Sequence, residues 1–431
     1  MKLQSVRVAN FKAIKTATLD IAPITVLVGA NGAGKSSLLH GPALLAETAV
    51  TGQAMPQPSG QGLDLGDNPR ALANGGSGWT VECTWQRDTP QLGSHTLTTT
   101  YTLPPQDPPR CSFRVVGIAP DRRPFDLLID SDQGSRLTLH HASNVASNAG
   151  SGTWTVMPQP IGFWSARAAG AQPSAPLAAA AVQQVKSLLD LANGAMAADT
   201  VIPALSSFSY IPGNRDIPAS TYGVGGRPPR LRSPQDLVSR LLYDRQLRFA
   251  VADRCEQTLG FRIDVDFHVN NTASILVQFP NHPEFNVVNV GAGFVQAMWL
   301  ATCLEDLTTA AAGQESRGDK SAIIPTIAIE EPELHLHPLH QRAIVRLLVA
   351  HAQSGFPVIL TTQSEHILIA LLHAVAGGAM APADLAVYHV REGTARRCVV
   401  TDTGSLEGGL PGFAEVEEGE LQAYIDILRS K

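Results

Sequence analysis

A chain of 431 residues is long enough for two or three compact units, or for one large α/β domain with insertions. Apolar residues make up 44% of the chain and charged residues 16%, a globular balance that excludes an intrinsically disordered protein. Lys and Arg number 32 against 38 Asp and Glu, and the net charge of −6 excludes a general attraction to nucleic acid or anionic lipid.

Three strands are predicted at the start of the chain. Residues 4–9 and 18–21 carry apolar side chains at alternate positions, as half-buried strands do. Residues 24–28, Ile-Thr-Val-Leu-Val, form a nearly continuous β-branched run that ends at a glycine. Such a run is typical of a strand that is buried on both faces.

A complete GxxxxGK[ST] motif, a P-loop, occupies residues 29–36, between this strand and a helix predicted over residues 35–48. The backbone NH groups of such a loop and the positive end of the helix bind phosphate. Lys35 would reach the β- and γ-phosphates, and the hydroxyl of Ser36 would coordinate Mg²⁺. The motif predicts a site for Mg-ATP made of Asn31, Gly32, Ala33, Gly34, Lys35, Ser36 and Ser37.

A β-rich insertion follows this helix. Residues 51–75 are rich in Gly, Pro, Gln and Asn, which predicts a loop. Further strand-like segments are separated by Pro, Gly and Asn clusters, which favours antiparallel pairing. These segments are residues 79–86, 96–103, 112–118 and 154–158.

Helical patterns return at residues 177–192 and 234–259, and residues 263–269 and 274–279 then predict a β-hairpin. The stretch 215–262 contains nine arginines and no lysine. Arginine suits phosphate, so these residues could face DNA or supply a charge to a neighbouring subunit, but paired arginines on helix faces would explain them as well. They are Arg215, Arg227, Arg230, Arg232, Arg240, Arg245, Arg248, Arg254 and Arg262.

The rest of the chain alternates helix and strand, which predicts a parallel α/β core split by the long insertion. Helices are expected at residues 293–311, 339–353 and 365–375, and strands at 323–329 and 358–361, with a final strand pair.

Two adjacent carboxylates, Glu330 and Glu331, end the strand predicted at 323–329. On a strand neighbouring the P-loop, Glu330 could coordinate Mg²⁺ and Glu331 could act as general base toward the attacking water. Glu333 is a less favoured base. The nearby histidines could suggest a metal site, but a turn and helix start explains them better because no cysteine lies near. They are His335, His337 and His340.

The P-loop, residues 6–11, the sequence EEPELHLHP at 330–338 and TTQSEH at 361–366 together resemble a known family. They are similar to the ABC-type, AAA-family standalone ATPases of bacterial conflict (anti-phage) loci, which include the overcoming-lysogenization-defect and Septu-type ATPases. The resemblance covers residues 1–60 and 285–415. It implies an α/β fold: a P-loop NTPase head of ABC type with an antiparallel β insertion and a helical subdomain.

The resemblance also suggests a division of the chain. Residues 1–50 and 285–431 would form the ATPase core, and residues 51–165 the β-rich insertion. Residues 166–284 would form a helical, arginine-rich subdomain with a β-hairpin. Two chains would then sandwich two ATP molecules head to tail.

In that family a signature element completes the ATP site of the partner subunit. The matching stretch is residues 289–296, in which Gly291 and Gly293 would approach phosphate, although an ordinary glycine-containing helix start is the alternative. Gln363 stands where such ATPases often carry a switch histidine. Either Gln53 or Gln61 could join Mg²⁺ to the lid.

The resulting hypothesis is a Mg-dependent ATPase that dimerises to regulate a separate effector protein, a nuclease being one candidate, in anti-phage defence. The alternative is a DNA-repair or chromosome-clamping ATPase that binds DNA directly. No apolar stretch reaches the roughly 18 residues of a membrane span, and no secretory signal is visible. Five dispersed cysteines fit reduced thiols, so a cytoplasmic protein without a membrane partner is expected.

Overall fold

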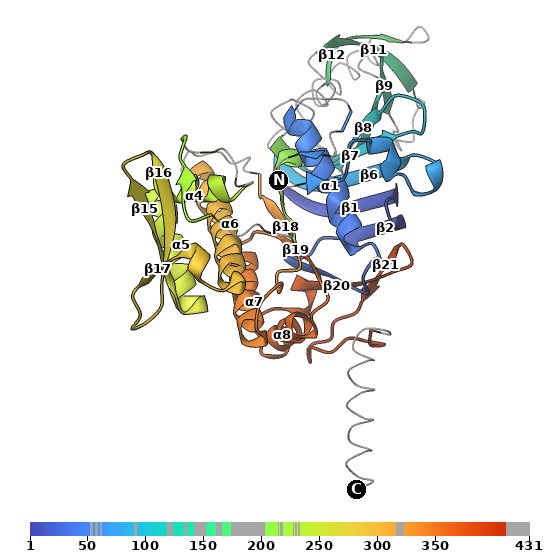
Figure 1. The fold of residues 1–431 in the computed structure, drawn as a ribbon. Coiled ribbons are helices and arrows are strands. Elements are labelled where there is room, and N and C mark those ends of the chain that lie inside the picture. Colours follow the sequence, from blue (N-terminus) through green and yellow to red (C-terminus); the bar gives the residue numbers. More distant parts are fainter. Residues whose placement is uncertain are drawn as a thin grey trace.

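The computed structural model has two large sheets, two smaller ones and the helices that join them (Figure 1). It describes residues 1–51, 55–56, 59–60, 63–89, 93–118, 124–132, 136–141, 152–160, 166–173, 203–213, 215, 219–226, 228, 231, 233–315 and 323–410.

A six-stranded sheet holds the P-loop strand, in the order β13-β18-β19-β3-β20-β21. All its neighbouring strands are parallel except β20 and β21. Only β19 separates β3 from β18, so the carboxyl ends of the strand before the P-loop and of the strand before Glu331 lie on one edge. The strands are β13 (Phe208–Ile211), β18 (Thr326–Glu330), β19 (Val358–Thr362), β3 (Ile24–Val28), β20 (Leu385–Arg391) and β21 (Thr394–Cys398).

The second sheet is antiparallel and has nine strands, in the order β12-β11-β10-β9-β8-β7-β6-β1-β2. Because β1 pairs with β6, the amino-terminal hairpin and the insertion share one sheet. The strands are β1 (Lys2–Phe11), β2 (Ile14–Asp20), β6 (Trp79–Thr89), β7 (Gly93–Leu103), β8 (Arg110–Ile118), β9 (Pro124–Asp132), β10 (Arg136–His141), β11 (Gly152–Pro160) and β12 (Ala166–Pro173).

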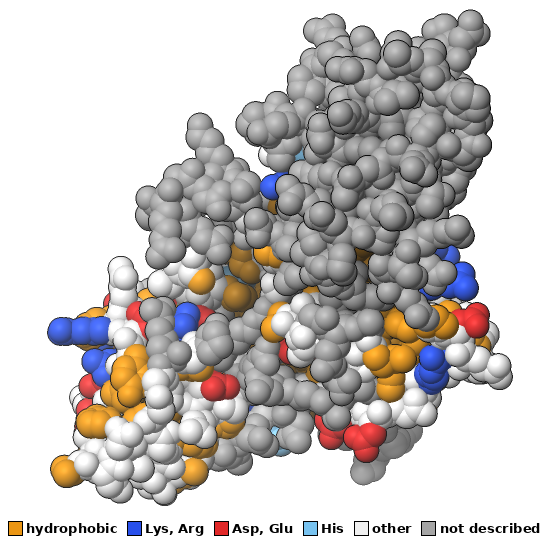
Figure 2. Space-filling model, turned by 90° about the horizontal axis from the view of Figure 1, so that it is seen from above, with side chains coloured by type: hydrophobic (Ala, Val, Ile, Leu, Met, Phe, Trp, Pro, Cys, Tyr) orange, Lys and Arg blue, Asp and Glu red, His pale blue; other side chains and the backbone are white. Residues whose placement is uncertain are grey.

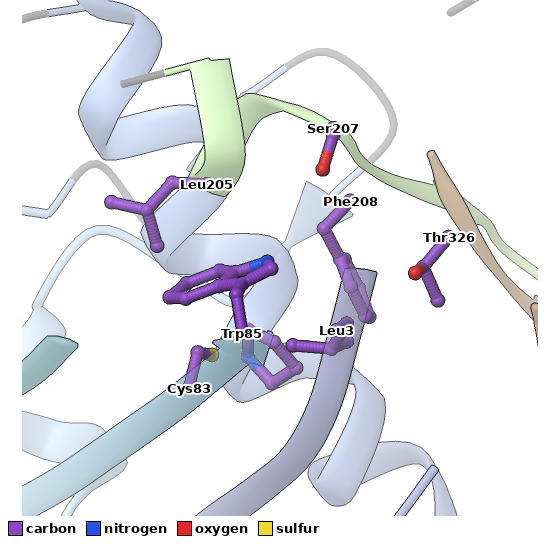
Figure 3. A pocket seen from close by; sticks show the side chains of 8 residues that line it. Leu3, Cys83, Trp85, Leu205, Ser207, Phe208 and Thr326 are labelled. Atoms are coloured by element: carbon purple, nitrogen blue, oxygen red, sulfur yellow. The ribbon is translucent and has the colours of Figure 1, made fainter. Parts of the chain in front are cut away.

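Helix α1 (Lys35–Thr51) packs between the two sheets. Its buried leucines, Leu38 and Leu39 among them, share one hydrophobic core with Val8 of β1 and Ile359 of β19. Near this junction a cavity of about 10 Å³ is lined mainly by apolar side chains (Figure 3). It could hold at most a single water molecule, so it is a packing defect and not a ligand site.

The opposite face of the six-stranded sheet packs into a second core, in which Val26 and Val28 of β3 lie with side chains of the later helices. These are α4 (Pro234–Tyr243), α5 (Arg245–Leu259), α6 (Ala292–Glu315), α7 (Pro338–Gln353) and α8 (Glu365–Ala376). A small sheet of β14 (Tyr222–Gly223), β15 (Arg262–His268), β16 (Thr272–Gln278) and β17 (Glu284–Asn286) lies beside α4 and α5 (Figure 1). A short pair, β4 (Ser59–Gly60) and β5 (Leu63–Asp64), follows α1.

The predicted α/β fold, with a P-loop after a buried strand, an antiparallel insertion and a helical part, is confirmed. The helical pattern predicted over residues 234–259 is present as two helices, because Asp244 ends α4 and its carboxylate accepts a hydrogen bond from the backbone of Leu247 to start α5. The helix predicted at 177–192 lies outside the described residues. Within the described part of the chain, no helix combines the length and apolarity that crossing a membrane requires.

Candidate active site

The P-loop joins the buried end of β3 to the start of α1, and its backbone requires glycine. Gly32 has φ of +74°, and an added Cβ would meet no atom within 4 Å, so its backbone faces open space. Gly34 has φ of +106°, and an added Cβ would lie 2.6 Å from Cδ1 of Ile14. Asn31 and Gly32 are exposed, Ala33 is half-buried and Ser37 is buried. A loop of this kind at a helix start forms a cradle that fits phosphate.

Lys35 is buried beneath this loop. Its Nζ donates hydrogen bonds to the carbonyl oxygens of Gly29 at 2.7 Å and Ala30 at 3.0 Å. Burial lowers the pKa of Lys35, whereas nearby carboxylates, that of Glu331 foremost, act in the opposite direction. The ammonium is thus held at the phosphate cradle by weak carbonyl acceptors that an anionic phosphate can replace.

Ser36 and Glu330 come from different motifs, and the structure brings the Ser36 side chain near enough to the Glu330 carboxyl to affect its pKa. Burial by itself would raise the pKa of the Glu330 carboxyl, but contacts with His40, Ser36 and the backbone NH of Gly213 outweigh it, and the pKa is lowered. An ionised carboxylate beside a hydroxyl fits Mg²⁺, which is usually bound by one or two protein oxygens together with phosphate and water.

His40 is a site residue that sequence reasoning missed. It lies one turn after Ser36 on α1, and its Nε2 is 3.0 Å from Oε1 of Glu330. The Nζ of Lys12 is 2.9 Å from its Nδ1. Because an ammonium can only donate, Nδ1 accepts this hydrogen bond. The Nε2 atom also lies 3.0 Å from the hydroxyl of Tyr210. The four-residue spacing from Ser36 was the available signal, since it places both side chains on one helix face.

Glu331 follows β18 in a left-handed conformation, with φ of +41°. Such a conformation is uncommon for a non-glycine residue and is held in place by its surroundings. Its backbone NH donates to the carbonyl of Thr361 at 3.0 Å. Nε2 of Gln363 donates to Oε1 of Glu331 at 2.5 Å. Gln363, which was predicted from a different motif, therefore contacts the predicted general base directly.

Glu333 stabilises the turn after β18 through hydrogen bonds. One oxygen accepts hydrogen bonds from the hydroxyl of Thr362 at 2.7 Å and from the backbone NH of Gln363 at 3.0 Å. Burial raises the pKa of Glu333. These contacts fix the end of β19 against the turn after β18, so Glu333 has a structural task independent of catalysis.

The predicted signature glycines lie at the start of α6, and they differ in how closely other atoms pack against them. Gly291 is exposed, and an added Cβ would meet only Phe294, at 3.8 Å. At Gly293 an added Cβ would lie 2.6 Å from the carbonyl oxygen of His335. Close packing of α6 on the turn before α7 therefore accounts for the glycine at 293, whereas Gly291 is free to approach a ligand.

Substituting these two glycines should separate packing from binding. We expect Gly293→Ala to lower the free energy of unfolding by about 1–3 kcal/mol, because the backbone of His335 would have to move. Gly291→Ala should change it by less than about 0.5 kcal/mol. Urea unfolding of both variants measures the difference, and equal stabilities would contradict the packing described for α6.

Other candidates lie apart from this site or outside the described residues. Gln53 and Gln61 are among the residues that the structure does not describe. His337 caps the start of α7, and within the described ranges no group of three or more His, Cys, Asp or Glu side chains could hold a metal ion.

Two family models match the sequence. The first, described as "AAA ATPase domain", matches residues 1–47 and so includes the P-loop. The second, described as "AAA domain, putative AbiEii toxin, Type IV TA system", matches residues 182–370 and so includes Glu330 and Glu331. Each half of the site therefore lies in a stretch that is similar to an AAA family model. No curated protein matches the chain.

Among solved structures the chain is similar to heads of SMC proteins. The SMC head domain from Thermotoga maritima is 11% identical, with a TM-score of 0.37 and coverage of 93% of this chain and 100% of that one. An SMC head bound to the C-winged helix domain of ScpA is 10% identical, with a TM-score of 0.42 and coverage of 92% and 97%. A head domain with an extended coiled coil, bound to a ScpA domain derived from Pyrococcus furiosus, is 10% identical, with a TM-score of 0.38 and coverage of 92% and 95%.

Proposed function

We propose that this chain is a Mg-dependent ATPase that hydrolyses ATP to ADP and phosphate. The observation that carries the proposal is the meeting of the P-loop helix and the end of β18: Nε2 of His40, one turn after Ser36, is 3.0 Å from Oε1 of Glu330. It brings the two predicted Mg²⁺ ligands together beside Lys35 and Glu331. Phosphate release from Mg-ATP by the purified chain, suppressed when Mg²⁺ is chelated, tests the proposal. A chain without turnover would contradict it.

Each residue has a distinct task in the proposed mechanism. The P-loop amides and Lys35 bind the phosphates, and Ser36 and Glu330 hold Mg²⁺, which supplies positive charge to the phosphate oxygens when bound. Gln363 holds Oε1 of Glu331, which leaves Oε2 to accept the proton of the attacking water. The contact between His40 and Glu330 keeps the carboxylate oriented toward Ser36.

We further propose that two chains form a head-to-tail dimer around two ATP molecules and that this dimer regulates a separate effector in a bacterial conflict system. Gly291, exposed at the start of the 24-residue helix α6, supports a phosphate contact in the partner subunit. The matched family model described as a type IV toxin–antitoxin component supports the setting.

Direct DNA binding, the alternative function, loses support from the arginines that the structure describes. Three of them form ion pairs of 2.6–2.7 Å: Arg240 with Asp306, Arg254 with Glu305 and Arg262 with Glu256. On the face shown in Figure 2, basic side chains lie among acidic and apolar ones and do not form a continuous basic patch over the described surface. These arginines mainly join helices and strands.

We therefore expect the chain alone to bind duplex DNA weakly, with little dependence on salt. Fluorescence anisotropy at increasing salt, with ATP present, measures this. Each neutralised phosphate would add about 0.9 to the slope of log affinity against log salt. A steep slope that flattens when Arg227, Arg230 and Arg232 are replaced would establish the DNA-clamping alternative and assign the contact to these three residues, which lie outside the described ranges.

A further inference from the structure

The guanidinium of Arg215 is buried between the start of α6 and the turn that carries Glu331. Arg215 is 5% exposed. Its Nη1 donates to the backbone carbonyl of Glu330 at 3.2 Å, and its Nη2 donates to the carbonyl of Glu331 at 3.0 Å. Its Nε donates to the side-chain oxygen of Gln296 on α6. One side chain thus joins two elements that are separate in sequence.

The contact with α6 is reciprocal and rigid. Nε2 of Gln296 donates to the backbone carbonyl of Arg215 at 2.8 Å, so two hydrogen bonds fix the pair. Gln296 is 3% exposed and lies about one turn from the start of α6, the end that carries Gly291. A displacement of this first turn would therefore move the guanidinium with it.

The contact with the turn holds an unusual backbone. Glu331 has φ of +41°. The backbone carbonyls of Glu330 and Glu331, which precede and follow the N–Cα bond of Glu331, both accept hydrogen bonds from Arg215. Burial lowers the pKa of Arg215 to about 10, so the guanidinium remains charged near neutral pH. The planar fork of arginine can make all these bonds at once, which the single ammonium of lysine cannot.

We propose that Arg215 is a positioning residue that sets the orientation of Glu331 according to the position of the first turn of α6. The inference rests on the proposed ATPase function. In the dimer, a contact of Gly291 with the partner's nucleotide would thereby influence proton acceptance by Glu331 in its own subunit. Arg215 itself touches neither phosphate nor water in this scheme.

Arg215→Lys tests the proposal, with Arg240→Lys as matched control. Arg240 is also a mostly buried arginine bonded to α6, through Asp306, but it does not contact the turn after β18. A misplacement of about 1 Å can slow catalysis by about 10²-fold. We expect Arg215→Lys to lower kcat by about that factor, with KM and the Kd for ATP changed less than about twofold, and Arg240→Lys to keep the parent kcat.

Gln296→Met provides an independent test that leaves Arg215 in place. It removes both bonds of the pair at similar volume, and we expect it to lower kcat without changing the Kd for ATP. The double variant should be no slower than Arg215→Lys, because the two residues act through one connection. Parent kcat in both single variants, or a loss of ATP binding equal to the loss of kcat, would overturn the proposal. A parent chain that does not hydrolyse ATP would instead refute the proposed function.

Discussion

Lys35→Ala should raise the Kd for Mg-ATP by at least about 10²-fold, because it removes the positive charge at the phosphate cradle. Lys35 would make two hydrogen bonds, one to the β- and one to the γ-phosphate. A hydrogen bond to a charged group contributes about 1.5–3 kcal/mol, and each 1.4 kcal/mol is about tenfold in affinity. Lys35 donates to both Gly29 and Ala30 within the loop, so the substitution also removes the ammonium that holds these carbonyls. Isothermal titration with ATP and Mg²⁺ measures the change.

Lys15→Ala is the matched control for this substitution. It removes the same charge from an exposed position on β2, outside the cradle. Its Kd for ATP should equal that of the parent chain. If Lys35→Ala binds ATP with an affinity near that of the parent, the P-loop is not the nucleotide site.

Glu331→Gln should slow hydrolysis by about 10²–10⁴-fold, the usual contribution of a general base, and leave ATP binding intact. The amide keeps the oxygen that accepts from Gln363, so the turn retains its shape while losing the group that takes a proton. Because hydrolysis would reopen the sandwich, the variant should accumulate as an ATP-bound dimer. Light scattering and the amount of retained nucleotide measure both effects.

Two companion variants separate the roles of the carboxylates. Glu330→Gln should lose Mg-dependent nucleotide binding, because it removes the charge that faces Ser36. Glu333→Gln should hydrolyse ATP at nearly the parent rate. The amide oxygen can still accept the hydrogen bonds from the hydroxyl of Thr362 and the backbone NH of Gln363. If Glu333→Gln is the inactive variant, the base is Glu333 and the assignment of Glu331 is wrong.

Local sequence predicted the elements that carry the nucleotide site because their patterns are strong. The strand predicted at residues 24–28 has the same bounds as β3, and the bounds of helices α7 and α8 agree with the predicted ones within one residue at either end. Each motif was also predicted at the end of a strand, but β19 lies between β3 and β18, which were expected to be neighbours. In each case the signal is contained within fewer than twenty consecutive residues.

Contacts between distant segments could not be predicted in this way. Strand β13 is a short apolar run whose parallel pairing with β18 depends on residues more than a hundred positions later. Arg215 was one of nine arginines in a region considered for DNA binding, and its contacts with Gln296 and Glu331 follow only from the folded chain. The antiparallel strands β9, β10 and β12 were also missed, because a sheet of this size is determined by pairing across many turns.

The rate of phosphate release from Mg-ATP, compared between the parent chain and Glu331→Gln at equal concentration, tests the central claim most directly. The claim is that the P-loop and the paired carboxylates form one ATPase site. We predict Mg-dependent turnover by the parent chain and a rate lower by about 10² or more in the variant, with ATP still bound. Equal rates in the two proteins, or no turnover by the parent, would contradict it.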